Sequence, residues 1–325
     1  MSGAMTGPAS AGGTEDGAFL LVDKPRGPTS HQVTAWVRDL LGVDRAGHAG
    51  TLDPNVSGVL WIGYGSALKL LPLVLEFPKR YVGVAQLHGS VGARELDRTL
   101  GEFVGPIYQT PPVRSAVKRE RRVRTIYRLA RLESDGERFV IDVIADSGTY
   151  IRTLAVDLGE ALGVGAHLEE LRRISTGPFE ETKAVTLGQL ADAVALRSEG
   201  DPAPLAALLH PIEEVWREFP EIVVKDPAAS ALAHGAGLAS GGILKIPKAF
   251  ARGARVALIT RNGELVATGV ARYASSEIAS VPHGWVVEGT RVFVDPSRFP
   301  ALWRASRRAS RPEGPDSVAD RSPAS

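Results

Sequence analysis

Apolar residues recur at intervals of three and four in two parts of the chain, and each part is predicted to form an amphipathic helix. Thr29 or Ser30 can cap the first helix, and Gly42 can end it. Gly163 closes the second. The apolar positions are Val33, Trp36, Val37, Leu40 and Leu41 in the first helix, and Ile151, Leu154, Ala155, Leu158 and Leu162 in the second. Both helices are therefore expected to bury one face.

Shorter apolar runs predict strands between these helices. Residues 81–87 and 138–145 are rich in β-branched and aromatic side chains. Before the first helix, residues 19–22 form a short apolar run that ends in a turn-rich loop. In 138–145 both alternating sets of side chains are partly apolar, which predicts a sheet covered on both faces at that point. Thr186 can cap a further helix. The pattern up to this point is therefore a mixture of helices and strands.

A change in composition at residues 198–220 divides the chain. This segment contains four prolines and one short helical pattern, which is typical of a linker. After it, Asn262-Gly263 joins two apolar runs in the manner of a β-hairpin. Further strands are predicted at 285–287 and 291–294. The second unit is therefore expected to be small and mostly β.

The composition excludes several kinds of chemistry. The chain has no cysteine, so disulfides, thiolate nucleophiles, Fe–S clusters and cysteine zinc sites are excluded. Its seven histidines are scattered and form no HExxH motif, so no metal is expected. The chain has no run of 18 apolar residues and no signal-peptide pattern. We therefore expect a cytoplasmic protein that does not associate with a membrane.

Local charge is more informative than the net charge of +1. Residues 114–131 hold eight Lys or Arg and one Glu, together with Tyr127. A run of this kind either contacts a phosphate backbone or forms a solvated charged surface.

The most unusual segment is GHAGTLDPNVSGVL at residues 47–60. The chain has no GxSxG or GxxxxGK[ST] motif, so catalysis is left to carboxylates and histidines. The glycines let the backbone approach a ligand closely, and Pro54 favours an extended conformation for Asp53. Thr51 can orient the Asp53 carboxylate, which can then act as a nucleophile or a base. By itself, however, an Asp-Pro pair is more often a simple turn.

This segment resembles the catalytic motif of the TruB/dyskerin family of pseudouridine synthases. Four other segments resemble motifs of the same family, in the family's order and spacing. They are DKPRGPTS at 23–30, Lys79-Arg80-Tyr81, SGTYIRTLAVDLGEALGVGAHLEELRR at 147–173 and STGPF at 175–179. Residues 109–127 and the C-terminal unit resemble the archaeal and eukaryotic dyskerin branch, which is the catalytic subunit of H/ACA guide ribonucleoproteins. In that branch the C-terminal unit is a PUA domain.

The resemblance implies an α+β fold class. Residues 18–219 are expected to form a catalytic domain of the pseudouridine synthase fold, with a mixed, mainly antiparallel sheet. Residues 220–298 are expected to form a small β-rich PUA domain that binds RNA. Residues 1–17 and 299–325 are expected to be tails, the second of them basic and polar. Residues 109–131 are expected to form a mobile, thumb-like segment that clamps RNA.

The resemblance also implies the roles of individual residues. Asp53 is the essential carboxylate, and Arg152 pairs with it and keeps it ionised in a buried site. Tyr81 and Tyr150 flank the flipped base. Leu171 packs against the base, although its helical spacing is equally typical of a core position.

Other residues near Asp53 have two interpretations each. Lys24, beside Pro25, either reaches a phosphate or supports the pocket. His48 either stacks in the space left by the flipped nucleotide or anchors the catalytic loop. The RNA-binding residues expected in the thumb-like segment are Arg114, Lys118, Arg119, Arg121 and Arg122. The isomerisation adds and removes no groups or electrons, so no cofactor is expected.

Three hypotheses about function follow. The leading one is an RNA-guided enzyme that modifies rRNA with an H/ACA guide RNA and the small protein subunits of the archaeal particle. The second is a stand-alone enzyme that modifies a uridine in the T-loop of tRNA. The third is a catalytically silent RNA-binding scaffold, against which the set of Asp53, Tyr81, Tyr150 and Arg152 argues.

Overall fold

The computed structural model describes residues 17–111, 120–281 and 284–299. The chain forms two compact units that divide after Glu218. Apart from their ends next to the two units, the predicted tails lie outside the described residues.

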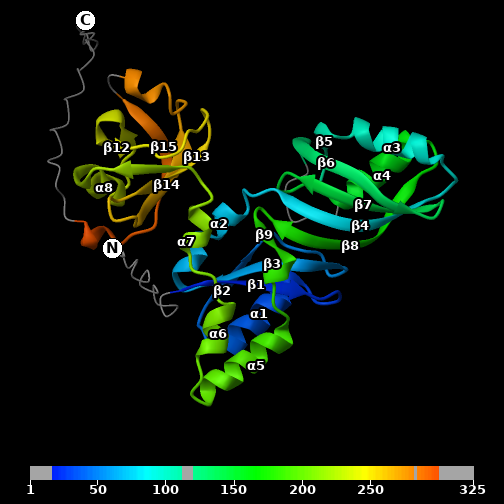
Figure 1. The fold of residues 1–325 in the computed structure, drawn as a ribbon, viewed down its shortest axis with the longest axis horizontal. Helices are drawn as coiled ribbons and strands as arrows, with labels where there is room; N and C mark the ends of the chain where they lie inside the picture. Colours follow the sequence, from blue (N-terminus) through cyan, green and yellow to red (C-terminus); the bar gives the residue numbers. More distant parts are fainter. Residues whose placement is uncertain (1–16, 112–119, 282–283, 300–325) are drawn as a thin grey trace, which may run out of the picture. The chain divides into compact units, whose positions relative to one another are not determined.

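Among the described residues of the first unit, nine strands form one sheet (Figure 1). Their bounds are β1 (Phe19–Lys24), β2 (Ala46–Ala49), β3 (Val56–Tyr64), β4 (Lys79–Leu87), β5 (Gly105–Gln109), β6 (Arg122–Ser134), β7 (Arg138–Ala145), β8 (Ala166–Thr176) and β9 (Phe179–Glu180). The order across the sheet is β1-β3-β8-β4-β7-β6-β5, with β2 on β3 and β9 on β8. Only β3 and β8 pair in parallel among these neighbours, which confirms the mixed, mainly antiparallel sheet.

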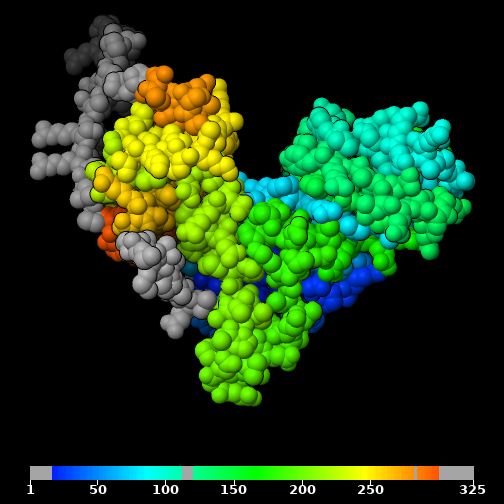
Figure 2. All heavy atoms as spheres, viewed as in Figure 1, coloured from blue at the N-terminus to red at the C-terminus, as the bar shows by residue number. Residues whose placement is uncertain are grey.

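Helices cover two parts of this sheet. The helices of the first unit are α1 (Ser30–Leu41), α2 (Leu71–Val74), α3 (Ala93–Glu102), α4 (Ile151–Ala161), α5 (Leu187–Ser198), α6 (Ala203–Leu208) and α7 (Glu213–Trp216), with 3-10 turns at Gly65–Lys69 and Glu181–Lys183. Helices α1, α5 and α6 share a core with β1 and β3. Helices α3 and α4 share another core with β4, β6 and β7. In the space-filling view, α3 and the β5–β6 hairpin lie at one end of the first unit and α5 and α6 at another (Figure 2).

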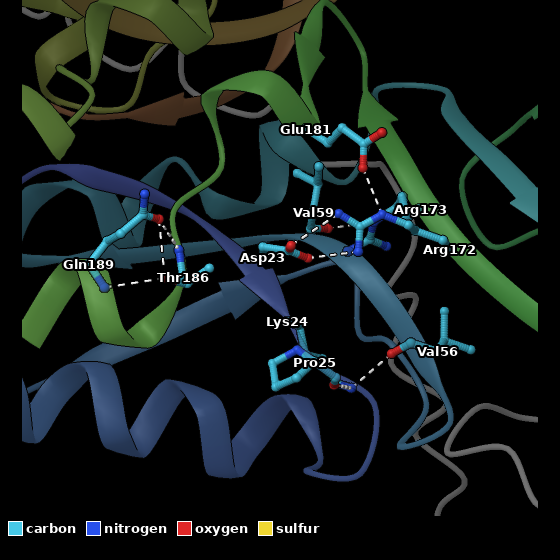
Figure 3. Close-up of polar contacts among 10 residues, drawn as sticks. All are labelled: Asp23, Lys24, Pro25, Val56, Val59, Arg172, Arg173, Glu181, Thr186 and Gln189. Carbon is cyan, nitrogen blue, oxygen red and sulfur yellow. Dashed lines mark hydrogen bonds and ion pairs between the residues drawn. The ribbon is translucent and has the colours of Figure 1, made fainter.

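The predicted N-caps of α1 and α5 are confirmed. Thr29 accepts a hydrogen bond from the Gln32 amide at α1, and the Gln32 side chain accepts one from Thr29. Thr186 and Gln189 form the same capping box at α5 (Figure 3). The prediction that Trp36 faces inward is wrong, because its side chain is 45% exposed. The interior positions of α1 are spaced by four residues and are Val33, Val37 and Leu41.

Strand β8 contradicts the helical spacing predicted for Leu171. Its sequence, AHLEELRRIST, is rich in helix-forming residues. It is nevertheless hydrogen-bonded to β3 on one side and to β4 on the other. Gly58 permits the close approach of β3, since its φ is 102° and a Cβ there would lie 2.1 Å from the Arg173 carbonyl oxygen. Pairing on both edges outweighs a helix preference of at most about 0.7 kcal/mol per residue.

Part of the predicted thumb-like segment, residues 109–131, belongs to regular β-strands. β5 and β6 pair as an antiparallel hairpin, from Gly105 opposite Ile126 to Gln109 opposite Arg122. β6 also pairs with β7, so its backbone is held inside the sheet. Residues 122–131 therefore lie in the sheet, and the mobility of the segment stays a prediction. Residues 112–119 lie outside the described residues.

The second unit is mostly β, as predicted. Among its described residues, six strands form a sheet in the order β11-β15-β14-β13-β10-β12, and one helix packs on it. The elements are β10 (Glu221–Val224), α8 (Asp226–Ala233), β11 (Leu238–Ala239), β12 (Ile243–Lys245), β13 (Arg255–Ile259), β14 (Leu265–Ala271) and β15 (Trp285–Val292), with 3-10 turns at Ser240–Gly242, Ile278–Ser280 and Pro296–Arg298. The hairpin at Gly263 is confirmed. The two strands predicted at 285–287 and 291–294 are instead one strand, β15.

Candidate active site

Asp53 lies in a turn between β2 and β3, and the first residues of α1 hold this turn in place. The Ser30 hydroxyl accepts a hydrogen bond from the Leu52 amide and donates one to the Leu52 carbonyl, both at 2.8 Å. The Pro54 carbonyl accepts a hydrogen bond of 2.8 Å from the Gly27 amide. The backbone on either side of Asp53 is therefore held in place by α1 and by the segment before it.

The Asp53 carboxylate forms an ion pair with the guanidinium of Arg152. Arg152 lies in the first turn of α4, so the pair joins two elements that are distant in sequence. The Asp53 side chain is 50% exposed, and that of Arg152 is 59% exposed. The expectation of a buried carboxylate is therefore wrong. Thr51 was expected to orient Asp53, but its hydroxyl contacts His48 instead.

Arg173, which was not predicted from the sequence, supports the same loop from its buried side. Its side chain is only 1% exposed. Its Nε donates a hydrogen bond of 2.7 Å to the Val59 carbonyl (Figure 3), and its Nη2 donates one of 2.6 Å to the Gly50 carbonyl. Gly50 has a φ of 71°, and a Cβ there would lie 3.1 Å from Arg173 Nη1. The guanidinium and the glycine therefore fit each other closely. A fully buried arginine is rare in proteins, but no sequence pattern marks this one.

Lys24 supports the loop rather than reaching toward solvent. Its side chain is fully buried. Its Nζ donates hydrogen bonds of 2.8 Å to the carbonyls of Pro25 and Val56 (Figure 3). It donates a third, of 3.3 Å, to the Pro54 carbonyl. Burial lowers the pKa of Lys24, and the nearby Asp53 carboxylate acts in the opposite direction. Of the two interpretations of Lys24, these contacts favour structural support.

His48 connects α1 to the loop at residues 50–55, which carries Asp53, through two threonines. Thr34 donates its hydroxyl proton to the Ser30 carbonyl at 2.7 Å, so it can only accept from His48 Nδ1, which lies 2.9 Å away. Nδ1 must therefore carry the proton. The other ring nitrogen, Nε2, lies 3.2 Å from the Thr51 hydroxyl. In the neutral ring Nε2 is an acceptor, so Thr51 donates to it.

The surroundings of His48 favour this neutral form. Burial lowers the pKa of His48, and the nearby His31 and Arg173 lower it further. The ring of His31 also lies edge-to-face with that of His48, with centroids 4.7 Å apart. Because both nitrogens of His48 are engaged within the protein, the contacts favour the anchoring interpretation over the stacking one.

Tyr150 is positioned by Gln109, another residue that was not assigned to the site from the sequence. Tyr150 is the N-cap residue of α4. Its amide donates a hydrogen bond of 2.9 Å to Gln109 Oε1, and its carbonyl accepts one of 3.2 Å from Gln109 Nε2. Gln109 is 3% exposed and ends β5. The start of α4, which carries Arg152, is therefore tied to the edge of the sheet.

Tyr81 and Leu171 lie on the central strands next to the Asp53 turn. In the pairing register Leu171 stands beside Val56, the first residue of β3 after the turn. Leu171 also stands opposite Gly83, two residues from Tyr81 on β4. Both side chains are partly buried against the core cluster that includes Ile151 at the start of α4. The turn, the start of α4 and these strands therefore bring the predicted catalytic and base-binding residues into one region.

The predicted RNA-binding residues are only partly described. Arg114, Lys118 and Arg119 lie outside the described residues. The guanidinium of Arg121 lies 4.3 Å from the centroid of the exposed Tyr108 ring. Arg122 lies in β6, and it is part of the sheet rather than of a loose segment.

The chemistry available at this site comes from side chains. In the part of the chain that the structure describes, no group of three or more His, Asp or Glu is arranged to hold a metal ion. Among the described helices, none has both the length and the apolar character needed to cross a membrane. An accessible carboxylate paired with a guanidinium, next to two tyrosines, suits nucleophilic or acid–base chemistry on a planar, polar substrate.

Comparison with known proteins gives the family. Three family models match the chain in succession. They are the TruB family pseudouridylate synthase N-terminal domain at 38–151, the tRNA pseudouridylate synthase B C-terminal domain at 152–216 and the PUA domain at 220–293. A probable tRNA pseudouridine synthase B of Pyrobaculum arsenaticum is 46% identical over 295 residues, which are 90% of this chain and 89% of that protein. A protein of the same name from Methanothermobacter thermautotrophicus is 46% identical over 87% of this chain and 88% of its own length.

Solved structures give a consistent result. A chain in the crystal structure of a Cbf5-Nop10-Gar1 complex is 40% identical, with a TM-score of 0.79, over 88% of this chain and 87% of that one. A chain in the structure of an H/ACA RNP bound to a substrate RNA containing 2′-deoxyuridine is 38% identical, with a TM-score of 0.75, over 88% of each. The fold and these matches define a pseudouridine synthase, an RNA isomerase. Within that class, the chain belongs to the TruB family and carries a PUA domain.

Proposed function

We propose that this chain converts uridine to pseudouridine within an RNA, at the carboxylate of Asp53. The bond between uracil N1 and ribose C1′ breaks, the uracil turns, and its C5 bonds to the same C1′. The hydrogen at C5 leaves as a proton, and N1 is protonated in exchange. Because nothing else enters or leaves, the reaction balances without a cofactor.

The observation that carries this proposal is the Asp53–Arg152 ion pair at the surface of a fixed turn. A uridine inside an RNA helix hides its glycosidic carbon, so it must be flipped out before a carboxylate can reach it. A half-exposed Asp53 is accessible to such a nucleotide, and Arg152 holds one of its oxygens. This arrangement supports attack on the sugar, addition to the base and proton abstraction alike.

Tyr81, Tyr150 and Leu171 are proposed to hold the detached uracil. The two aromatic rings supply a stacking surface. Leu171, which pairs with Val56 of β3, supplies an apolar contact. Uracil that stays next to the ribose recombines in an effectively unimolecular step, which avoids the entropic cost of a second encounter. Gln109 fixes the backbone of Tyr150, so the position of this ring does not depend on the RNA alone.

We further propose that a guide RNA of the H/ACA class directs the enzyme to its rRNA target, with small protein subunits bound to the catalytic domain and the PUA domain on the guide. The similarity to chains solved in Cbf5-Nop10-Gar1 and H/ACA RNP complexes supports this proposal. The names of the relatives from Pyrobaculum and Methanothermobacter support a second candidate, a stand-alone enzyme that acts on tRNA. A catalytically silent scaffold would need neither Asp53 nor Arg152.

Release of tritium from RNA labelled at uracil C5 tests these proposals. The full chain is incubated with a complementary rRNA fragment, an H/ACA guide and the partner proteins, and separately with tRNA alone. We expect release that depends on the guide. Release from tRNA without a guide would favour the stand-alone enzyme instead. Bound RNA with no release under any condition would contradict the catalytic proposal and favour the scaffold.

A further inference from the structure

A groove of about 460 Å³ runs between α1 and β2, beside the catalytic loop. Its volume lies within the usual range for ligand pockets, about 300–1,000 Å³. Among the residues that line it, those with polar side chains are His31, Thr34, Arg38, His48 and Thr51. Thr51 precedes Asp53 by two residues on the same loop. The groove therefore lies beside the loop that carries Asp53.

The polar groups of this groove fall into two sets. Thr34, His48 and Thr51 are bonded to one another and keep the catalytic loop in place. His31 and Arg38 are exposed on α1, two helical turns apart along the helix. Among the described residues, the His31 ring nitrogens have no hydrogen-bond partner, so they remain available to a ligand.

The charge in the groove is suited to an anion. No carboxylate is among the residues that line it. Arg38 contacts the neighbouring Asp39 through Nε and Nη2, at 2.9 and 2.7 Å. Its Nη1 has no partner among the described residues and can donate to a second acceptor. Arginine forms strong, directional hydrogen bonds to phosphate oxygens, and histidine nitrogens can add one more.

We propose that this groove binds the sugar–phosphate backbone beside the target uridine, with Arg38 and His31 on its phosphates. The inference rests on the proposed function, because it takes Asp53 as the position of the uridine. Backbone contacts fix register without reading sequence, which suits an enzyme that must accept different neighbouring bases. A strand that is held beside Asp53 also loses less freedom when its uridine flips.

The first test is the kinetics of Arg38→Ala and His31→Ala. We expect Arg38→Ala to raise KM for RNA about tenfold, as removal of a charge-assisted hydrogen bond implies, with a much smaller change in kcat. The slope of log affinity against log salt should become shallower by about 0.7 for each single-strand phosphate that the protein no longer neutralises. The matched control is Arg98→Ala, because Arg98 is also an exposed helical arginine beside an acidic partner, Glu102. If Arg38→Ala and His31→Ala behave like this control, the groove does not hold RNA.

The second test locates the phosphate and does not require turnover. Equilibrium binding is measured with RNAs in which one phosphate near the target uridine is replaced by an uncharged methylphosphonate. At one linkage, the replacement should weaken binding to the wild-type chain about as much as Arg38→Ala does, and it should weaken binding to that variant little further. Full additivity at every linkage would overturn the inference. Wild-type protein that binds RNA but releases no tritium would contradict the proposed function. The binding comparison between the methylphosphonate RNAs and Arg38→Ala would still test the groove.

Discussion

Arg152 and Asp53 are 99 positions apart in the sequence, and the fold joins them in an ion pair. Each comes from an element with its own support. Asp53 lies in a turn held by α1, and Arg152 lies in the first turn of α4, whose N-cap residue is bound by Gln109. Because both supports come from the protein's own residues, we infer that the fold itself orients the carboxylate. Preorganisation of this kind removes a cost that would otherwise fall on the reaction step.

Replacement of Arg152 tests this orientation. Arg152→Ala leaves the carboxylate without its guanidinium partner, and we expect the single-turnover rate to fall on the order of 100-fold. Arg152→Lys keeps the charge but not the planar, directional donors, so it should recover only part of the rate. RNA binding by both variants, measured at equilibrium, should change much less than the rate. A lysine variant as fast as the wild type would show that the geometry of the guanidinium contributes nothing, and an alanine variant as fast as the wild type would contradict the orienting role of Arg152.

The neighbouring residues Arg172 and Arg173 provide a comparison within one strand. Successive side chains on a strand point to opposite faces, so the two arginines have different surroundings. Arg173→Met leaves the buried Val59 carbonyl and the partly buried Gly50 carbonyl without this donor, and we expect it to lower the free energy of unfolding by about 2–4 kcal/mol. Arg172 instead pairs with Asp23 and Glu181 in a partly exposed cluster (Figure 3). Its replacement by Met should cost about 1 kcal/mol. Urea unfolding measures both, and a larger effect of Arg172→Met would contradict this account.

The tautomer of His48 can be observed directly. The proton on Nδ1, donated to Thr34, and the lowered pKa predict a neutral ring at pH 7. Long-range ¹H–¹⁵N spectra of the imidazole should show Nδ1 protonated and Nε2 bare. The ring should titrate below the ordinary value of 6.5. A proton on Nε2 at pH 7, or a titration at 6.5 or above, would contradict the assigned contacts.

Lys79 makes stability depend on pH in the neutral to alkaline range. Burial lowers its pKa from 10.5 to about 7, and the Arg173 charge contributes in the same direction. Between these values the unfolded chain holds a proton that the folded chain has released, so the contribution of Lys79 to stability rises with pH from about 7 to about 10. The free energy of unfolding of the wild type should rise relative to that of Lys79→Met over this range.

The contacts of Lys79 act against so large a shift. Its Nζ donates to the carbonyls of Leu75 and Phe77 at 2.8 and 2.6 Å, and hydrogen bonds of this kind favour the charged amine. If burial dominates, the free energy of unfolding of the wild type rises with pH relative to that of Lys79→Met. If these hydrogen bonds cancel the effect of burial, it does not. Parallel pH profiles for the two proteins would show that hydrogen bonding has offset burial, and would contradict the prediction.

The sequence predicted the parts of the fold that rest on local rules. The caps at Thr29 and Thr186 and the turn at Gly263 each depend on residues within a few positions of one another. Strand β8 was missed because its local preference is helical, and pairing with β3 and β4 decides its conformation. The inward position assigned to Trp36 was wrong because periodicity gives the apolar face but not its width.

The candidate site was predicted in a similarly uneven way. The family motifs pointed to Asp53, Tyr81, Tyr150 and Arg152, and the fold brings the elements that carry them into one region. The residues that hold these side chains were missed, because their roles depend on contacts across more than 40 positions, such as Gln109 with Tyr150 and Arg173 with Gly50. For Lys24, whose role the sequence left open, burial and three carbonyl contacts favour structural support.

The most direct test of the central claim is tritium release by Asp53→Asn under single-turnover conditions, with Asp44→Asn as the control at another exposed aspartate, which lies just before β2. The amide keeps the size of the side chain but cannot act as a nucleophile or a base. We predict that Asp53→Asn binds RNA like the wild type and releases no tritium, while Asp44→Asn retains wild-type release. Tritium release by Asp53→Asn at a rate near that of the wild type would contradict the assignment of Asp53 as the essential carboxylate.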